Sequence, residues 1–209
     1  MKQPLVFFTN PMSRGRTVRW MLEEIGQPYE TRVIAFGPEM KAASYRAINP
    51  MGKVPALQHG STTITEVGAI LAYLADAFPD AGLAPAVGDA ARGDYYRWMF
   101  FAAGALEYAV TNQSFGFTLG NPKDRGRMGY GSYEDAIAAL EQGVAGKTYL
   151  AGASFTAADL YVTAFLAYAM MVGGIEKKPA FEAYVSHHVN RPAALRARSI
   201  DDALIPKPA

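Results

Sequence analysis

The spacing of hydrophobic residues changes between strand-like and helical patterns along the first 80 residues of this 209-residue chain. This change restricts the folds that the chain can form. Residues 5–8 (LVFF) form a short apolar run closed by Thr-Asn-Pro, which is typical of a buried strand. Apolar residues then recur at helical spacing from Val18 to Ile25, and Gly26 follows where a helix end favours left-handed backbone. The sequence therefore predicts a strand, a loop and a helix in that order.

The alternation of strands and helices continues to residue 78. We expect a strand over residues 29–36 and a short surface helix over residues 38–47. Two strands over residues 56–59 and 62–65 would form a hairpin around Gly60-Ser61, and a longer helix follows over residues 67–78. A βαβ unit followed by ββα predicts a mixed four-stranded sheet with the two longer helices packed on it.

The stretch PDAGLAPAVGDA, residues 79–90, separates two parts of different character. Beyond it no segment favours a strand. The helical patterns cover residues 91–110, 133–144, 157–172, 180–188 and 192–198. We therefore predict an α/β domain at residues 1–80, a linker at 81–90 and an all-helical domain at 91–209.

A capping signal precedes the helix predicted at residues 157–172. Thr156 directly precedes this helix and Asp159 follows three residues later, which is the spacing of a capping box. Phe155 and Leu160 occupy the positions of a hydrophobic staple. We interpret Thr156 and Asp159 as structural residues that start the helix.

The chain contains no cysteine, and this absence limits its chemistry strongly. It excludes disulfides, thiolate metal sites and every mechanism in which the protein supplies a sulfur nucleophile. Any thiol chemistry must therefore use the thiol of a bound molecule.

Charge, motifs and hydropathy exclude further classes. Twenty Lys and Arg residues against 19 Asp and Glu leave a net charge of +1 without a basic stripe, so nucleic acid is not an expected partner. His59 is isolated, His187 and His188 are adjacent, and HExxH, EF-hand, P-loop and GxSxG motifs are absent, so no metal site is predicted. Residues 160–175 form the longest apolar stretch, shorter than the roughly 20 residues of a membrane span. We expect no membrane partner and, without a secretory signal, a cytoplasmic location.

Ser13 lies in the loop between the first predicted strand and the first predicted helix. Its hydroxyl is a candidate donor to a bound anion, assisted by unpaired N–H groups and by the positive end of the helix. Serine is also a favoured N-cap residue, so capping of the helix is the structural alternative. The sequence leaves both roles open.

Two further segments are candidates for a binding site. Val54-Pro55 opens the third predicted strand, where X-Pro statistics favour a trans bond. A cis bond would leave the Val54 N–H and C=O free to pair with an extended peptide ligand. Glu66-Val67 begins the next helix, where an anion can bind. The alternative for Glu66 is an acidic residue that complements the helix dipole.

Several segments, in their order and spacing, resemble the cytosolic glutathione transferase superfamily over essentially the whole chain. They are TNPMSRGRTVRWMLEEIG, NPMGKVPAL, TEVGAILAYLADAFP, the FTAAD box and the RPA segment near the C-terminus. The resemblance implies a thioredoxin-like N-terminal domain, an all-helical C-terminal domain, a cis peptide bond before Pro55 and a homodimer. It also implies that the first domain binds glutathione as co-substrate and that the second supplies a pocket for an apolar electrophilic small molecule.

The resemblance implies roles for individual residues as well. Ser13 takes the place of the residue that activates the glutathione thiol, and Thr9 and Asn10 are nearby alternatives. The glutathione-binding candidates are Val54 for the cysteinyl backbone, next to Pro55, Lys53 for the glycyl carboxylate, Glu66 with Val67 for the γ-glutamyl end, and Lys41 as a second basic group. The candidates for the electrophile pocket are Met12, Trp98, Phe101, Tyr108, Phe115, Phe117, Tyr168 and Met171. Packing in a core is the structural alternative for each residue of this last group.

One position departs from the family pattern. Val67 stands where the family commonly has serine, so a hydroxyl that would bind the γ-glutamyl carboxylate is missing and weak glutathione binding is predicted. The lack of cysteine argues against the branches that form mixed disulfides with glutathione and favours conjugation or a related glutathione-dependent reaction, such as an isomerisation, a reduction or an ether cleavage. The alternatives are a noncatalytic protein of this fold that binds ligands and a purely structural interaction module.

Overall fold

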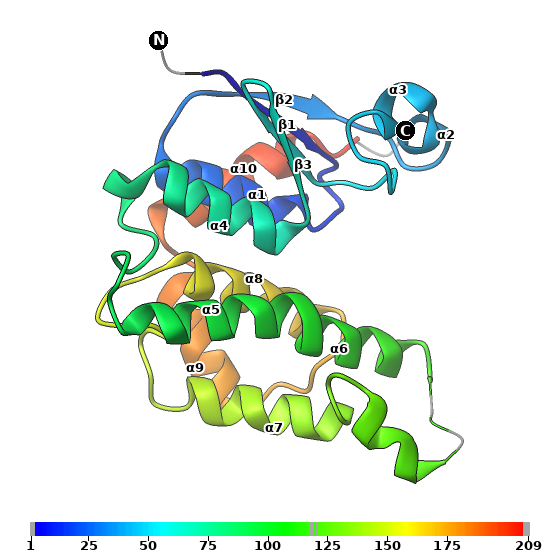
Figure 1. Ribbon diagram of the computed structural model, residues 1–209, viewed down its shortest axis with the longest axis vertical. Helices are drawn as coiled ribbons and strands as arrows, with labels where there is room; N and C mark the ends of the chain where they lie inside the picture. Colours follow the sequence, from blue (N-terminus) through cyan, green and yellow to red (C-terminus); the bar gives the residue numbers. More distant parts are fainter. Residues whose placement is uncertain (1–2, 118, 120, 207–209) are drawn as a thin grey trace. The chain divides into compact units, whose positions relative to one another are not determined.

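The computed structural model describes residues 3–117, 119 and 121–206, and the chain forms two compact units. The first unit contains the residues up to Ala81 together with those from Arg191 onward. The second unit contains Gly82–Asn190. Each unit has a different architecture, and Figure 1 shows the elements of both.

A mixed four-stranded sheet forms the centre of the first unit. Its strands are β1 (Leu5–Thr9), β2 (Tyr29–Val33), β3 (Ala56–His59) and β4 (Thr62–Thr65), in the order β2-β1-β3-β4. Strand β1 runs parallel to β2 and antiparallel to β3, and β3 pairs antiparallel with β4. The predicted βαβ and hairpin arrangement is confirmed.

The helices of this unit cover both faces of the sheet. They are α1 (Gly15–Ile25), α2 (Pro38–Lys41), α3 (Ala43–Arg46), α4 (Val67–Ala77), the 3-10 turn η1 (Pro79–Ala81) and α10 (Pro192–Ala203). Helices α1, α4 and α10 lie on one face, as Figure 1 shows, and the Arg19 side chain of α1 lies over the Phe7 ring there. Because neighbouring strand residues point to opposite faces, Phe8 points the other way and packs with Met40 and Tyr45.

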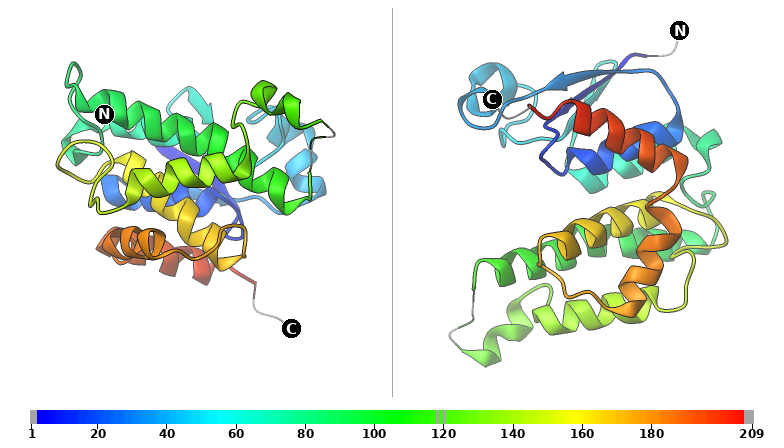
Figure 2. Two further views of the ribbon diagram at one scale, coloured as in Figure 1. Left: turned by 90° about the horizontal axis from the view of Figure 1, so that it is seen from below. Right: turned by 180° about the vertical axis from the view of Figure 1, so that it is seen from behind.

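The second unit is entirely helical within the described residues. Its elements are α5 (Ala91–Phe101), the π-helical turn η2 (Ala102–Leu106), α6 (Glu107–Ser114), the 3-10 turn η3 (Pro122–Arg127), α7 (Tyr133–Val144), α8 (Ala157–Met171) and α9 (Pro179–His188). Helix α8 packs against α5 and α9, and α7 packs against α6 and α9, which Figure 2 shows from two further sides. The π turn divides the segment predicted as a single helix at residues 91–110.

The start of α8 is fixed by one buried carboxylate. Asp159 accepts hydrogen bonds from Thr156 N–H and Oγ1, from Leu150 N–H and from the Tyr184 hydroxyl, all at 2.7–2.8 Å. Its two oxygens therefore join the helix start, the preceding loop and α9. Thr156 and Asp159 have structural partners, as the capping signal predicted.

The last helix differs from the predicted domain organisation. Helix α10 belongs to the first unit, whereas the sequence placed residues 91–209 in one helical domain. Ion pairs between α1 and the α10 segment supply the physical reason: Arg16–Asp202, Arg19–Asp201, Arg196–Glu23 and Arg191–Glu24. Residues 82–90, expected as a linker, belong to the second unit, and residues 207–209 lie outside the described residues.

Candidate functional site

Three segments predicted to form the site meet at one end of the sheet. Phe8 of β1 is paired with Ala56 of β3, and Ala56 is paired with Thr65 of β4. The residues that follow Phe8 and Thr65 and those that precede Ala56 therefore leave the sheet at the same end. This register brings together the 9–13 loop, Val54-Pro55 and Glu66.

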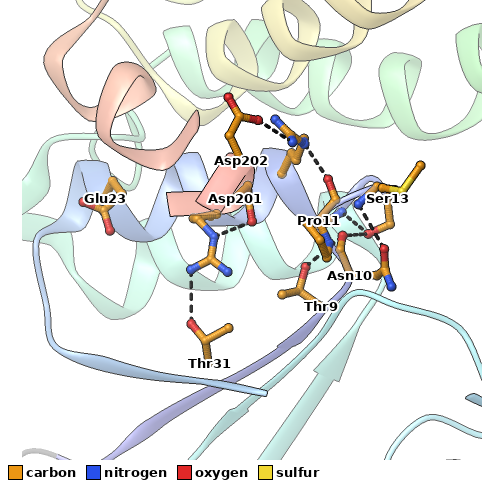
Figure 3. A network of polar contacts seen from close by, with 12 residues as sticks. Thr9, Asn10, Pro11, Ser13, Glu23, Thr31, Asp201 and Asp202 are labelled. Atoms are coloured by element: carbon orange, nitrogen blue, oxygen red, sulfur yellow. Dashed lines mark hydrogen bonds and ion pairs between the residues drawn. The ribbon is translucent and has the colours of Figure 1, made fainter. Parts of the chain in front are cut away.

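The Ser13 hydroxyl is occupied within its own loop. It donates to the Asn10 carbonyl at 2.7 Å and accepts from the Gly15 N–H at 3.0 Å, and these bonds are visible in Figure 3. The Asn10 carbonyl also accepts from the Ser13 N–H at 3.0 Å. The hydroxyl satisfies one of the N–H groups at the start of α1, which is a capping role. The side chain is half-buried, so a ligand can still approach it.

Thr9 and Asn10 are placed less favourably for contact with a ligand. Thr9 is fully buried, and its Oγ1 lies so close to Gly15 that any side chain at Gly15 would overlap it. The Asn10 amide donates to the Ile34 carbonyl and accepts from the Met12 N–H, each at 3.0 Å. Both residues therefore hold the loop, and Ser13 is the more accessible of the three hydroxyl or amide candidates.

The Val54 peptide groups are open at this end of the sheet. The Val54-Pro55 bond is cis, which confirms what the family resemblance implied and differs from the trans form that base rates favour. Neither the N–H nor the C=O of Val54 has a hydrogen-bond partner within the described parts of the chain. A half-buried residue with both backbone groups unpaired can pair with an extended peptide, as an edge strand does.

The loop before Val54 is held by side chains that local sequence patterns do not single out. The Lys53 carbonyl accepts from the Tyr45 hydroxyl at 2.8 Å and from Asn49 Nδ2 at 2.6 Å. Burial raises the pKa of Tyr45 to about 12. Asn49 is almost fully buried and also accepts from the Met51 N–H. No helical or strand period marks Asn49, because its role is to pair backbone groups of a loop.

The two lysine candidates differ in availability. Lys41 Nζ donates to the Met51 carbonyl at 3.0 Å and to the Gly52 carbonyl at 2.8 Å, so it stabilises the loop. Lys53 is exposed, and its ammonium has no hydrogen bond or ion pair with any described residue. Of the two, Lys53 is the lysine free to bind a carboxylate.

Glu66 has an unusual backbone at the start of α4. Its φ of 69° and ψ of 127° make it the one non-glycine residue of the described chain with a left-handed φ. Such a conformation costs about 1–3 kcal/mol and is found at functional sites. Its carbonyl accepts from the Ile70 N–H, and the N–H groups of the first helical residues, beginning with Val67, have no earlier turn to bond to. This end of α4 can receive an anion.

The candidates for the electrophile pocket divide into exposed and buried residues. Trp98 is 1% exposed and lies against Gly143, where any added side chain would overlap its ring, so it is a core residue of the second unit. Phe101 is half-buried and packs edge-on against Trp98. The remaining candidates are exposed: Met12, Tyr108, Phe115, Phe117, Tyr168 and Met171.

The described residues contain neither a cluster of metal ligands nor a helix that could span a membrane. Within residues 3–117, 119 and 121–206, no group of three or more His, Asp or Glu side chains could hold a metal ion. Over the same described residues, no helix combines the length and the apolar character needed to cross a bilayer.

The fold is that of a thioredoxin-like domain followed by a helical domain, and comparison with known families agrees. The model of the glutathione S-transferase N-terminal domain matches residues 12–77, and that of the C-terminal domain matches residues 123–187. The first match includes Ser13, the Val54-Pro55 pair and Glu66. The chain belongs to the cytosolic glutathione transferase superfamily.

Relatives and solved structures extend over most of the chain. Glutathione S-transferase GST-4.5 of Xanthomonas campestris is 29% identical over 185 residues, which cover 83% of this chain and 89% of the relative. Glutathione S-transferase GstA of Escherichia coli O157:H7 is 28% identical over 159 residues, which cover 75% of this chain and 78% of the relative. A sphingomonad glutathione S-transferase complexed with glutathione has a TM-score of 0.75 at 28% identity, covering 94% of this chain and 98% of that one. A glutathione transferase from Methylococcus capsulatus has a TM-score of 0.78 at 25% identity, and the match covers 95% of this chain and 99% of that one.

Proposed function

We propose that the first unit binds glutathione and that the bound thiol is the nucleophile of a transferase reaction. The observation that carries this proposal is the open Val54 peptide, whose N–H and C=O are both unpaired. An extended peptide ligand can form a two-bond ladder with these groups. The glutathione in the sphingomonad structure supports the assignment of the ligand.

The two ends of glutathione have candidate partners on either side of Val54. The glycyl carboxylate is assigned to Lys53, whose ammonium is exposed and has no described partner. The γ-glutamyl end is assigned to Glu66 and the first N–H groups of α4: the Glu66 carboxylate can accept from the ligand's ammonium, and the Val67 N–H can donate to its carboxylate. The left-handed backbone of Glu66 supports this role.

The thiolate is assigned to the Ser13 hydroxyl after one rotation. A cysteine thiol with a pKa of about 8.5 is only about 3% ionised at pH 7, so a transferase must stabilise the anion. Rotation breaks the bond from Ser13 Oγ to the Asn10 carbonyl, but that carbonyl keeps the Ser13 N–H. A hydrogen bond between neutral groups contributes about 0.5–1.5 kcal/mol, and one to a charged group contributes about 1.5–3 kcal/mol. The Ser13 hydroxyl therefore gains stability when it donates to the thiolate in place of the Asn10 carbonyl.

In the proposed reaction the thiolate sulfur attacks an apolar electrophile. A carbon–sulfur bond forms as the leaving group departs with its electron pair. Exposed aromatic and methionine side chains suit such a ligand, and those of the second unit include Tyr108 and Met171. Assembly as a homodimer is part of the same proposal, and sedimentation of the purified protein tests it.

A noncatalytic ligand-binding role is the second candidate. Two observations favour it: the Ser13 hydroxyl already has a donor and an acceptor partner, and Val67 offers no hydroxyl to the γ-glutamyl end. Under this alternative glutathione binds without a lowered thiol pKa and no electrophile is turned over.

A pH series of thiolate absorbance separates the two candidates. For a transferase, we expect the thiol pKa of bound glutathione to lie about two units below that of free glutathione, equivalent to about 2.7 kcal/mol. Ser13→Ala should raise this pKa and lower turnover of a general aryl halide. Glutathione binding without a pKa shift or turnover would select the noncatalytic role, and an unchanged pKa in Ser13→Ala would remove Ser13 from the mechanism.

A further inference from the structure

One arginine connects the loop that carries Ser13 to the last helix of the chain. Arg16 Nε donates to the Pro11 carbonyl at 2.5 Å, and Arg16 Nη2 lies 2.6 Å from Asp202 Oδ1. Figure 3 shows this bridge between the 9–13 loop and α10. A single guanidinium therefore connects Pro11 and Asp202, which are 191 positions apart in the sequence.

Arg16 bonds to the loop at Ser13 and at Pro11, two residues earlier. Its side chain holds the carbonyl of Pro11, and its backbone N–H donates to the Ser13 carbonyl at 3.3 Å. Pro11 has no N–H, so its carbonyl is the one backbone hydrogen-bonding group it can offer to fix this turn. Movement of the Arg16 guanidinium would release that carbonyl and change the direction of the Ser13 hydroxyl.

We infer that Arg16, held by Asp202, is a positioning residue for the thiol-activating hydroxyl of Ser13. This inference rests on the proposed function of Ser13. The guanidinium is planar and rigid, so a carboxylate bound at Nη2 also sets the direction in which Nε donates. Asp202 acts on the site through Arg16 and the Pro11 carbonyl without contact with a ligand.

A purely electrostatic role for Arg16 makes the opposite prediction. The Arg16 charge would lower the pKa of a nearby thiol, and Asp202 would weaken that effect by partial neutralisation. The other charged pair at this end of α1 and α10 is Arg19 with Asp201, which neutralise each other. Loss of the Asp202 charge would then leave Arg16 more effective and lower the thiol pKa. Under the positioning role the same change raises the thiol pKa.

Three variants of the full chain test the inference by the thiol pKa of bound glutathione. We expect Asp202→Asn to raise it by about half a unit to one unit, the equivalent of one partly lost hydrogen bond. Arg16→Lys keeps the charge but lacks the planar fork that reaches both Asp202 and Pro11, and it should raise the pKa similarly. Arg196→Gln removes the ion pair to Glu23 at the other end of the same helix pair and should leave the pKa unchanged.

Binding of S-methylglutathione, which has no ionisable thiol, monitors the folded site. We expect its affinity to stay within about twofold of the parent protein in all three variants, because the pocket at Val54 is not altered. A retained affinity with a raised thiol pKa is a result that general loss of structure does not produce. Where Asp202→Asn does not fold, Arg16→Lys makes the same test.

The outcomes distinguish this inference from the proposed function. A thiol pKa that falls or stays unchanged in Asp202→Asn, or stays unchanged in Arg16→Lys, overturns the positioning role and leaves glutathione activation intact. If Arg196→Gln raises the thiol pKa as much as Asp202→Asn does, the positioning role is also overturned, because α10 would then affect the thiol only through the general stability of the unit. Failure of the parent protein to bind glutathione or to lower its thiol pKa overturns the proposed function itself, and the inference with it.

Discussion

One missing hydroxyl at the start of α4 sets the expected strength of glutathione binding. Val67 can offer its backbone N–H to the γ-glutamyl carboxylate but no side-chain donor. A hydrogen bond to a charged group is worth about 1.5–3 kcal/mol, or about 10- to 100-fold in affinity. We predict that Val67→Ser lowers the dissociation constant of glutathione by this factor in calorimetric titrations. Val67→Ala is the matched control, and equal gains in both variants, or none in Val67→Ser, would contradict the assignment.

Tyr45 predicts how the stability of the first unit depends on alkaline pH. Burial raises the pKa of Tyr45 to about 12, against about 10 for an exposed tyrosine in the unfolded chain. Between these values the folded protein holds a proton that the unfolded chain has lost, so the contribution of Tyr45 is complete below pH 10 and is lost as pH rises toward 12. Urea denaturation at pH 9 and pH 11 should show a smaller loss of stability in Tyr45→Phe than in the parent protein. Equal losses would mean that Tyr45 titrates normally.

Candidate site residues can be selected from the sequence where a functional group lies next to an element boundary. Ser13 and Glu66 stand at helix starts, and Val54 precedes a strand, so local pattern is sufficient to select them as candidates. Trp98 shows the limit, because an aromatic residue at helical spacing has the same pattern in a core as in a pocket. Asn49 and the backbone role of Lys41 could not be predicted, because their partners are loop carbonyls with no sequence signature.

At the scale of elements, one of the ion pairs between α1 and α10 is buried. Arg19 Nε lies 2.6 Å from Asp201 Oδ1, and both side chains are almost completely buried. One further atom of each, Arg19 Nη2 and Asp201 Oδ2, is buried without a hydrogen-bond partner among the described residues. Burial raises the pKa of the Asp201 carboxyl, whereas the hydrogen bond and charge of Arg19 lower it. We expect the pair to contribute little net stability, because the loss of hydration of two buried charges opposes their attraction.

A double-mutant cycle on Arg19 and Asp201 tests this expectation. Arg19→Met or Asp201→Leu alone leaves one buried charge without its partner and should lower the free energy of unfolding by about 3–5 kcal/mol. The double variant removes both charges and should recover most of this loss. The exposed pair Arg32–Glu30 is the control, because Arg32→Gln should leave the free energy of unfolding nearly unchanged. Urea denaturation measures all four variants, and additive losses in the double variant would show that the two residues do not act as a pair.

Local pattern predicted the elements themselves better than their assembly. The strands at residues 56–59 and 62–65 and the helix at 133–144 have the predicted bounds, because a Gly-containing turn and apolar spacing mark them directly. The packing of α10 on α1 could not be predicted from local pattern, because it depends on contacts between residues far apart in the sequence. Arg19 has the appearance of a surface residue in a sequence, and only the fold brings Asp201 to it.

At the scale of the whole molecule, the first and last described elements, β1 and α10, belong to the same unit. The first unit is completed by residues from Arg191 onward, and α10 buries Ala193, Ala194, Ala197 and Asp201 within it. A protein truncated after residue 190 would expose Arg19, which is 0% exposed in the folded chain and would lose its carboxylate partner. The last helix is therefore part of the unit that contains the four-stranded sheet, whereas the match to the N-terminal family domain ends at residue 77.

Hydrogen exchange can locate the effect of that truncation. We predict that removal of residues 191–209 abolishes glutathione binding and the protection of amides in β1 and α1, because α1 loses its packing partner and several ion pairs. Amides of α8, which belongs to the second unit, should keep most of their protection. Truncation after residue 204 retains Asp201 and Asp202 and should change neither binding nor protection. Equal loss of protection in α1 and α8 would instead mean that the two units unfold as one cooperative body, whereas full retention in α1 would show that the first unit is complete without α10.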